Sequence, residues 1–121
     1  MKKKILVAED EKDVVFVIRT ALEKDYEIVE AFDGKQALEK AKKEPPNLII
    51  LDIMMPEIDG YTVNQKLKED EKTKDIPVII ITGKGHVRQF FEDKKKAKID
   101  GYLEKPFSLK MLVKSIEKII K

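Results

Sequence analysis

The sequence predicts an α/β fold built on a doubly wound sheet of five parallel strands, with helices on both faces. Five short apolar runs alternate with stretches whose apolar residues recur at helical spacing. Several of these runs are unbroken Val, Ile and Leu, a composition typical of parallel strands buried on both faces. The 121 residues are expected to form one domain over residues 1–121, because a chain of this length builds a single core.

Each predicted strand is a short run rich in Val, Ile or Leu and bounded by polar residues, Gly or Pro. The predicted strands are residues 4–8, 27–31, 47–51, 78–81 and 101–103. The first, third and fourth are continuously apolar and therefore belong inside the sheet. The second has flanking glutamates and the fifth is very short, as edge strands often are. Right-handed crossovers then favour the order 2-1-3-4-5, the flavodoxin-like winding.

The helices are predicted from apolar residues at a spacing of three or four, together with capping residues and prolines at their ends. They cover residues 12–24, the stretch from Asp33 to the Pro45-Pro46 pair, the stretch through Val63 and Leu67, residues 86–98, and the stretch after Ser108. Asp33 and Ser108 are the expected N-caps, because their side-chain oxygens accept hydrogen bonds from the first turn.

The fourth and fifth predicted helices differ in character. In the fourth, the expected apolar contacts are Val87, Phe90 and Phe91. Its expected solvated face, or docking site for an acidic partner, is formed by Lys94, Lys95 and Lys96 with Lys98. In the fifth, the side chains expected to face inward are Leu109, Leu112, Val113, Ile116, Ile119 and Ile120.

The composition excludes several classes of protein. The chain has 25 basic and 23 acidic residues and a net charge of +2, without the basic excess of a nucleic-acid-binding domain. The lack of cysteine excludes a disulfide framework and a thiolate metal site. No run approaches the roughly 20 apolar residues that span a bilayer, and residues 5–8 are too short for a signal peptide. We therefore expect a cytoplasmic protein that binds neither nucleic acid nor membrane directly.

Reactive or charged side chains follow four of the five predicted strands. Glu9-Asp10-Glu11 follows the first strand, Asp52 the third, Thr82 the fourth and Lys105 the fifth. Doubly wound sheets bind ligands beyond the carboxyl ends of their strands, at the point where the winding reverses. In the order 2-1-3-4-5 this point lies between the first and third strands. The polar side chains are therefore expected to form one site at this edge of the sheet.

The charges in this expected site indicate a divalent cation. Glu9, Asp10 and Asp52 would lie close together, and each pair of carboxylates 4 Å apart repels by roughly 4 kcal/mol at an effective dielectric constant of about 20. One Lys105 cannot offset three such pairs. All candidate ligands are oxygens, which favours Mg²⁺. The Thr82 hydroxyl and the Lys105 ammonium are donors suited to a phosphoryl group, and Asp52 is the candidate nucleophile.

These residues occur in motifs whose order is specific. They are Glu9-Asp10, "LDIMMPEIDGY" around Asp52, Thr82, and "YLEKPF" with Tyr102 and Lys105. With these motifs, the chain resembles a response-regulator receiver domain, the CheY-like domain of two-component signalling, over essentially its whole length. The resemblance implies that Asp52 accepts a phosphoryl group from a phosphohistidine on a sensor histidine kinase or phosphotransfer protein. It implies a signalling domain that catalyses only its own phosphoryl transfer and slow dephosphorylation, not an enzyme.

The resemblance also implies roles for the surrounding residues. Glu9, Asp10, Asp52 and the backbone carbonyl of Met54 would position Mg²⁺, and Lys105 would pair with the phosphoaspartate. The Lys105–Pro106 peptide bond is cis in this family.

The resemblance further implies a conformational switch. Thr82 would move to bond a phosphoryl oxygen, and Tyr102 would rotate inward into the space that Thr82 leaves. This rotation would change the surface that the fourth helix, the fifth strand and the last helix present to a downstream protein or effector domain. The sequence alone leaves open that Tyr102 is an ordinary core aromatic. The interval from Thr82 to Tyr102 is one residue longer than is usual in the family.

Two other functions are compatible with parts of this pattern. A flavin mononucleotide electron carrier shares the winding, but it would need a Ser/Thr- and Gly-rich phosphate loop where this chain has Glu9-Asp10-Glu11. An aspartyl-phosphate hydrolase of the haloacid-dehalogenase kind has a second Asp two residues after its nucleophile, where this chain has Met54. Both comparisons favour the receiver.

Overall fold

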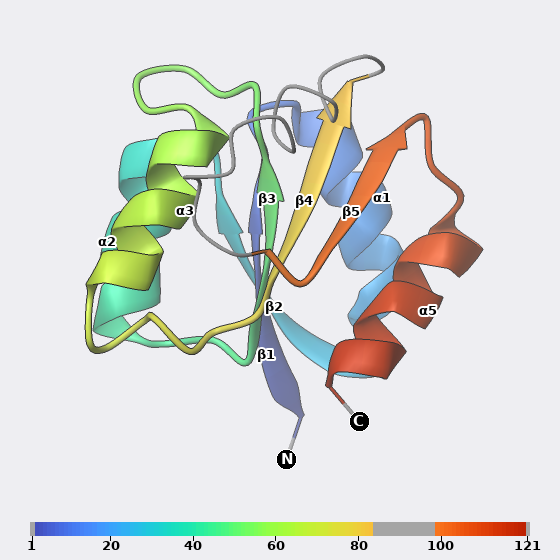
Figure 1. Cartoon of the computed structure of the whole chain (residues 1–121). Helices are drawn as coiled ribbons and strands as arrows, with labels where there is room; N and C mark the ends of the chain where they lie inside the picture. The colour runs from blue at the N-terminus through green and yellow to red at the C-terminus, as the bar shows by residue number, and fades with distance from the viewer. Residues whose placement is uncertain (1, 84–98, 121) are drawn as a thin grey trace.

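Five parallel strands form the centre of the structure, a computed structural model that describes residues 2–83 and 99–120 (Figure 1). The strands are β1 (Lys3–Ala8), β2 (Tyr26–Ala31), β3 (Leu48–Asp52), β4 (Val78–Gly83) and β5 (Gly101–Lys105). They are hydrogen-bonded in the order β2-β1-β3-β4-β5, and every neighbouring pair is parallel. The predicted fold class and strand order are therefore confirmed, with β2 and β5 at the edges.

The described part of the chain contains four helices, which cover both faces of the sheet. They are α1 (Lys12–Leu22), α2 (Gly34–Lys43), α3 (Gly60–Glu69) and α5 (Leu109–Ile119). Figure 1 shows α2 and α3 on one face and α1 and α5 on the other. The helix predicted at residues 86–98, with Val87, Phe90, Phe91 and its four lysines, lies outside the described residues. None of the described helices has the length and apolar character needed to cross a membrane.

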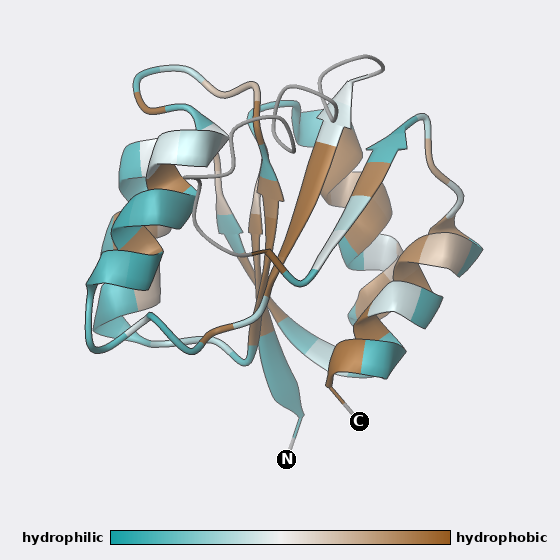
Figure 2. Ribbon diagram, viewed as in Figure 1, coloured by the Kyte–Doolittle hydropathy of each residue, from teal (hydrophilic) through white to brown (hydrophobic). Residues whose placement is uncertain are grey.

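Side chains alternate along the central strands between two buried cores. In β1, Leu6 and Ala8 belong to the core beneath α2 and α3, whereas Ile5 and Val7 belong to the core beneath α1 and α5. All five residues of β3 are buried, which explains why its sequence is an unbroken apolar run before Asp52. Figure 2 shows this hydrophobic centre between more polar outer helix surfaces. Full burial of one such Leu or Ile side chain contributes about 1.5–3 kcal/mol.

The predicted helix caps are present. Asp33 accepts a hydrogen bond from the Gln36 amide at 2.8 Å, and Ser108 accepts one from the Met111 amide at 3.1 Å. Asp59 caps α3 in the same way, through the Thr62 amide at 2.9 Å, although the sequence predicts it only as part of a loop. These caps fix where α2, α3 and α5 begin after the strands that precede them.

The sequence prediction is wrong at Leu109 and at several element ends. Leu109 does not face inward: it is 39% exposed, because it is the first residue of α5 and precedes the buried side that Leu112 and Ile116 form. The strands β4 and β5 also run two residues further than expected, to Gly83 and Lys105. The sequence prediction ended these strands where the apolar run ends, but backbone pairing continues through the polar residues that follow. Thr82 and Lys105 are therefore held by the sheet itself.

Candidate functional site

The carboxyl ends of β1, β3, β4 and β5 meet at one edge of the sheet, and the candidate site is formed there. Ala8, the last residue of β1, pairs with Leu51 of β3, so Glu9 and Asp52 are the next residues on two neighbouring strands. Asp52 pairs in turn with Ile81, next to Thr82 in β4. Sheet register therefore brings together residues that lie far apart in the sequence.

Three carboxylates gather at this edge, and we call Glu9, Asp10 and Asp52 the acidic triad. One carboxylate oxygen of each lies within 4.8 Å of the other two. Glu9 is fully buried and Asp52 is 2% exposed, whereas Asp10 is exposed to solvent. The three predicted carboxylate ligands thus come together, with Asp10 on the solvent side.

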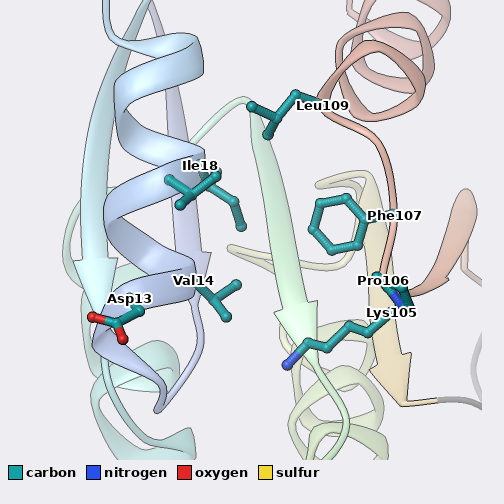
Figure 3. Close-up of a pocket in the computed structure, with 8 residues that line it drawn as sticks. Asp13, Val14, Ile18, Lys105, Pro106, Phe107 and Leu109 are labelled. Atoms are coloured by element: carbon teal, nitrogen blue, oxygen red, sulfur yellow. The ribbon is translucent and has the colours of Figure 1, made fainter.

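Lys105 brings one positive charge to the triad from the end of β5. Its Nζ donates hydrogen bonds to Oε2 and Oε1 of Glu9 at 3.0 and 3.2 Å and lies 3.6 Å from Oδ2 of Asp52. Figure 3 shows the Lys105 side chain reaching from the end of β5 toward the tip of β3. A third carboxylate, that of Glu11, lies 3.4 Å from the same nitrogen, a contact that the sequence pattern does not predict.

Backbone contacts hold Asp52 in place. Its Oδ1 accepts a hydrogen bond from the Met54 amide at 3.2 Å, and the Gly60 amide donates to the Ile53 carbonyl at 2.8 Å. A Cβ atom on Gly60 would lie 2.4 Å from the backbone oxygen of Asp52, so only glycine permits this approach of α3 to the site. Sequence reasoning missed this role, although the Asp59-Gly60 pair at a helix start was a visible signal.

Burial and mutual repulsion change the acidity of the buried carboxyl groups. The pKa of Glu9 is raised to about 7, because burial and then the nearby charge of Asp52 outweigh the opposing hydrogen bond from Lys105. Burial also raises the pKa of Asp52, while the charge of Lys105 lowers it in part. Burial alone would lower the pKa of Lys105, but its hydrogen bond to Glu9 and the charge of Asp52 raise the pKa overall. One amine therefore leaves the site short of positive charge.

Thr82 and Tyr102, the two residues expected to form a switch, lie on the neighbouring strands β4 and β5. Thr82 is fully buried, and its hydroxyl donates a long, 3.4 Å hydrogen bond to the Gly83 carbonyl. Tyr102 is 49% exposed, so it is not an ordinary core aromatic in this structure. The register pairs Thr82 with Glu104 and Ile80 with Tyr102, which puts both residues on the same face of the sheet.

An apolar groove of about 450 Å³ opens beside the site, between α1 and the segment that joins β5 to α5. Its lining residues are Asp13, Val14, Val17, Ile18, Lys105, Pro106, Phe107 and Leu109 (Figure 3). The Lys105–Pro106 peptide bond at its edge is cis, as the resemblance implied. The exposure of Leu109 reflects its position on this groove.

Comparison with known proteins assigns the family. The model of the response regulator receiver domain matches residues 5–117, so the chain belongs to the response-regulator receiver domain family. It is 41% identical over 121 residues to the probable transcriptional regulator ycf27 of Cyanophora paradoxa. This match covers 99% of this chain and 49% of that relative. It is 37% identical over 111 residues to the alkaline phosphatase synthesis transcriptional regulatory protein PhoP of Bacillus subtilis, covering 89% of this chain and 44% of that protein.

The chain therefore spans about half the length of these two relatives, and it spans 9% of histidine kinase P4 of Formosa agariphila, to which it is 40% identical. The longer relatives contain further sequence that this chain does not match.

Solved structures of receiver domains have the same fold. The receiver domain of the Francisella response regulator 1452 superposes with a TM-score of 0.86 at 32% identity, covering 98% of this chain and 96% of that one. The receiver domain of the sensor histidine kinase PA1611 from Pseudomonas aeruginosa PAO1 gives a TM-score of 0.88 at 26% identity, covering 99% and 98%. That structure has a magnesium ion coordinated in its active site cleft.

The family defines the general role of this chain. Receiver domains are the signalling domains of two-component response regulators rather than enzymes in the usual sense. They bind Mg²⁺ in an acidic pocket and interact with histidine kinases and downstream effectors. The flavin carrier and the aspartyl-phosphate hydrolase are therefore disfavoured.

Proposed function

We propose that this chain is a phosphorylation-switched receiver in which Asp52 accepts a phosphoryl group from a phosphohistidine on a sensor histidine kinase or phosphotransfer protein. One observation carries the proposal: the buried Asp52 carboxylate lies 3.6 Å from the Lys105 ammonium and within 4.8 Å of ligand oxygens from Glu9 and Asp10. A buried nucleophile next to a fixed cation and a cluster of oxygen ligands is the arrangement that phosphoryl transfer needs.

The donor set suits a magnesium ion. Three carboxylate oxygens lie close enough to share one cation, and no sulfur or imidazole ligand is among them, which favours Mg²⁺ over softer metals. We assign Glu9, Asp10, Asp52 and the backbone carbonyl of Met54 as the residues that would hold it. When bound, the ion would offset the negative charge of the acidic triad and of the transferring phosphoryl group.

The protein's own residues would carry the transfer as follows. A carboxylate oxygen of Asp52 attacks phosphorus, the new O–P bond forms as the P–N bond to the donor histidine breaks, and the imidazole leaves with the bonding pair and takes up a proton. Lys105 donates to a phosphoryl oxygen and neutralises part of its charge. Because this amine already lies 3.6 Å from Asp52, a short displacement is sufficient.

The phosphoryl group would then act on the switch residues. Among the described residues, the Thr82 hydroxyl has only a long hydrogen bond to the Gly83 carbonyl to give up, so reorientation toward a phosphoryl oxygen costs little. Tyr102, now half exposed, would rotate inward into the space that Thr82 leaves. This rotation would alter the surface that includes β5 and α5, which a downstream protein or effector domain would recognise.

Labelling with a small phosphodonor tests the proposal. Acetyl phosphate and Mg²⁺ should add one phosphoryl group to the wild-type chain, and Asp52→Asn should abolish the addition. The matched control is Asp59→Asn, because asparagine caps a helix as well as aspartate does and α3 should stay intact. Labelling of the Asp52→Asn variant at the wild-type rate would overturn the assignment.

A further inference from the structure

Glu11 places an additional carboxylate on Lys105 from outside the acidic triad. Its Oε1 lies 3.4 Å from Lys105 Nζ, and the Glu11 side chain is 65% exposed whereas that of Lys105 is 22% exposed. The same nitrogen donates to Glu9 at 3.0 Å and lies 3.6 Å from Asp52. An ammonium group has three N–H donors, whereas four carboxylate oxygens of these three acidic residues lie within 3.6 Å of the nitrogen, so the carboxylates compete for one amine.

The Glu11 side chain has no other described task. The residue is the N-cap of α1, yet its side chain forms no capping hydrogen bond. Its backbone carbonyl begins the helix by accepting from the amides of Val14 and Val15, both at 3.1 Å. Its backbone amide donates to Oε1 of Glu9 at 3.2 Å, which fixes Glu11 next to the buried part of the site. The carboxylate is thus directed at Lys105 and not at the helix.

We propose that Glu11 is a positioning residue that holds the Lys105 ammonium at the solvent side of the site and competes with the phosphoryl group for it. The inference rests on the proposed function, in which Lys105 donates to a phosphoryl oxygen. An N–H group that points at Glu11 does not point at that oxygen. Loss of the contact should therefore increase the affinity for a phosphoryl analogue and the labelling rate by about two- to five-fold, the range for a screened surface ion pair.

Three variants separate positioning from a general effect of charge. Glu11→Gln removes the charge at Glu11. Glu11→Asp keeps the charge but shortens the side chain, and aspartate at an N-cap turns toward the first helical amides, so the contact with Lys105 is lost. Asp13→Asn is the control, because it removes one charge from the same helix turn. Asp13 forms no ion pair with Lys105 among the described contacts, and Figure 3 shows the two side chains on opposite sides of the groove.

The measurement is a titration of each Mg²⁺-loaded protein with beryllofluoride, followed by NMR at the Met54 amide, which reports on Asp52. The ¹⁵N chemical shift of Lys105 Nζ reports on the contact with Glu11. If Glu11 had a merely structural role, its substitution would leave this shift unchanged. Positioning predicts that Glu11→Gln and Glu11→Asp both bind about two- to five-fold more tightly, that both shift the Lys105 signal, and that Asp13→Asn matches the wild type.

Two results would overturn the inference. In one, the Glu11→Asp variant binds beryllofluoride with the wild-type affinity, whereas the affinities of Glu11→Gln and Asp13→Asn change together. This result would show an effect of net charge only. In the other, both Glu11 variants match the wild type. If the wild-type protein itself fails to bind beryllofluoride, the proposed function is contradicted, so the two failures are distinguishable.

Discussion

The ammonium nitrogen of Lys105 lies 3.0 Å from Oε2 of Glu9, although 96 positions separate the two residues in the sequence. The contact joins β5, at one edge of the sheet, to the residue that follows the interior strand β1. It gives the buried Glu9 a counter-charge at hydrogen-bond distance and brings the amine within 3.6 Å of Asp52. The stability and the chemistry of the site therefore depend on the same pair.

Replacement of Lys105 by Met should destabilise the metal-free protein, because Glu9 and Asp52 would lose their shared cation. At pH 8 we expect a cost of about 3 kcal/mol, the lower end for a buried ion pair that loses one partner, because the Lys105 side chain is 22% exposed. At pH 5.5 the cost should be smaller, since Glu9 then binds a proton. Urea unfolding at both pH values measures the difference, with the exposed Lys110→Met as control. An equal cost at the two pH values would contradict this account of the pair.

Glu9 should make the metal-free protein less stable as the pH rises. Its pKa is about 7 in the folded state against an ordinary value of 4.5, so the folded state binds the proton more tightly. That contribution is complete below about pH 4.5 and is lost as the pH rises through 7, with a total of at most about 3 kcal/mol.

The variant Glu9→Gln should remove most of this pH dependence, because its amide does not titrate. Equilibrium unfolding between pH 5 and pH 8 with a chelator present measures it. A wild-type protein whose stability stays constant over that range would show that Glu9 does not titrate as its burial implies.

Asp10→Asn should stabilise the metal-free protein and weaken magnesium binding. Asp10 is exposed, so the gain should be no more than about 1 kcal/mol. Its charge also raises the pKa of Asp52, so its removal relieves repulsion within the triad. Thermal unfolding in chelator and then in excess Mg²⁺ checks this: the variant should have the higher midpoint without metal and gain less when metal is added. A lower midpoint in chelator would count against clustered carboxylates.

Gly60→Ala should damage the site through the backbone. The added Cβ would lie 2.4 Å from the Asp52 carbonyl oxygen and 2.6 Å from the Ile53 Cα, so α3 and the end of β3 must move apart. We expect a loss of about 1–3 kcal/mol in unfolding free energy and slower labelling of Asp52.

Gly101→Ala is the matched control for this substitution. Within the described part of the chain, its Cβ would meet only side-chain carbons of Ile79 and Ile119, at 3.7 and 3.9 Å, which is ordinary packing distance. Denaturant unfolding of the two variants should differ clearly. Similar costs for both would mean that close approach at Gly60 is not what requires glycine there.

The sequence was sufficient to predict the sheet and most of the site. Continuous apolar runs identify strands buried on both faces, and the winding order then decides which strand ends adjoin. For this reason the pattern of residues alone assigns Glu9, Asp52 and Lys105 to one edge of the sheet.

The remaining features depend on tertiary packing. Glu11 has the composition of an ordinary solvated loop residue, and only the position of Lys105 reveals its contact. Glycine is needed at position 60 because α3 begins in close contact with the Asp52 backbone. A local sequence pattern does not predict this contact. Leu109 has a helical apolar spacing but borders a groove instead of the core.

The most direct test of the central claim is to locate the phosphoryl group after treatment with acetyl phosphate. Borohydride reduces an acyl phosphate to the alcohol, so a phosphorylated aspartate becomes homoserine and peptide mass mapping identifies its position. The account predicts conversion at Asp52 alone, and only when Mg²⁺ is present. Conversion at another carboxylate, or conversion at Asp52 that is equally fast in chelator, would contradict it.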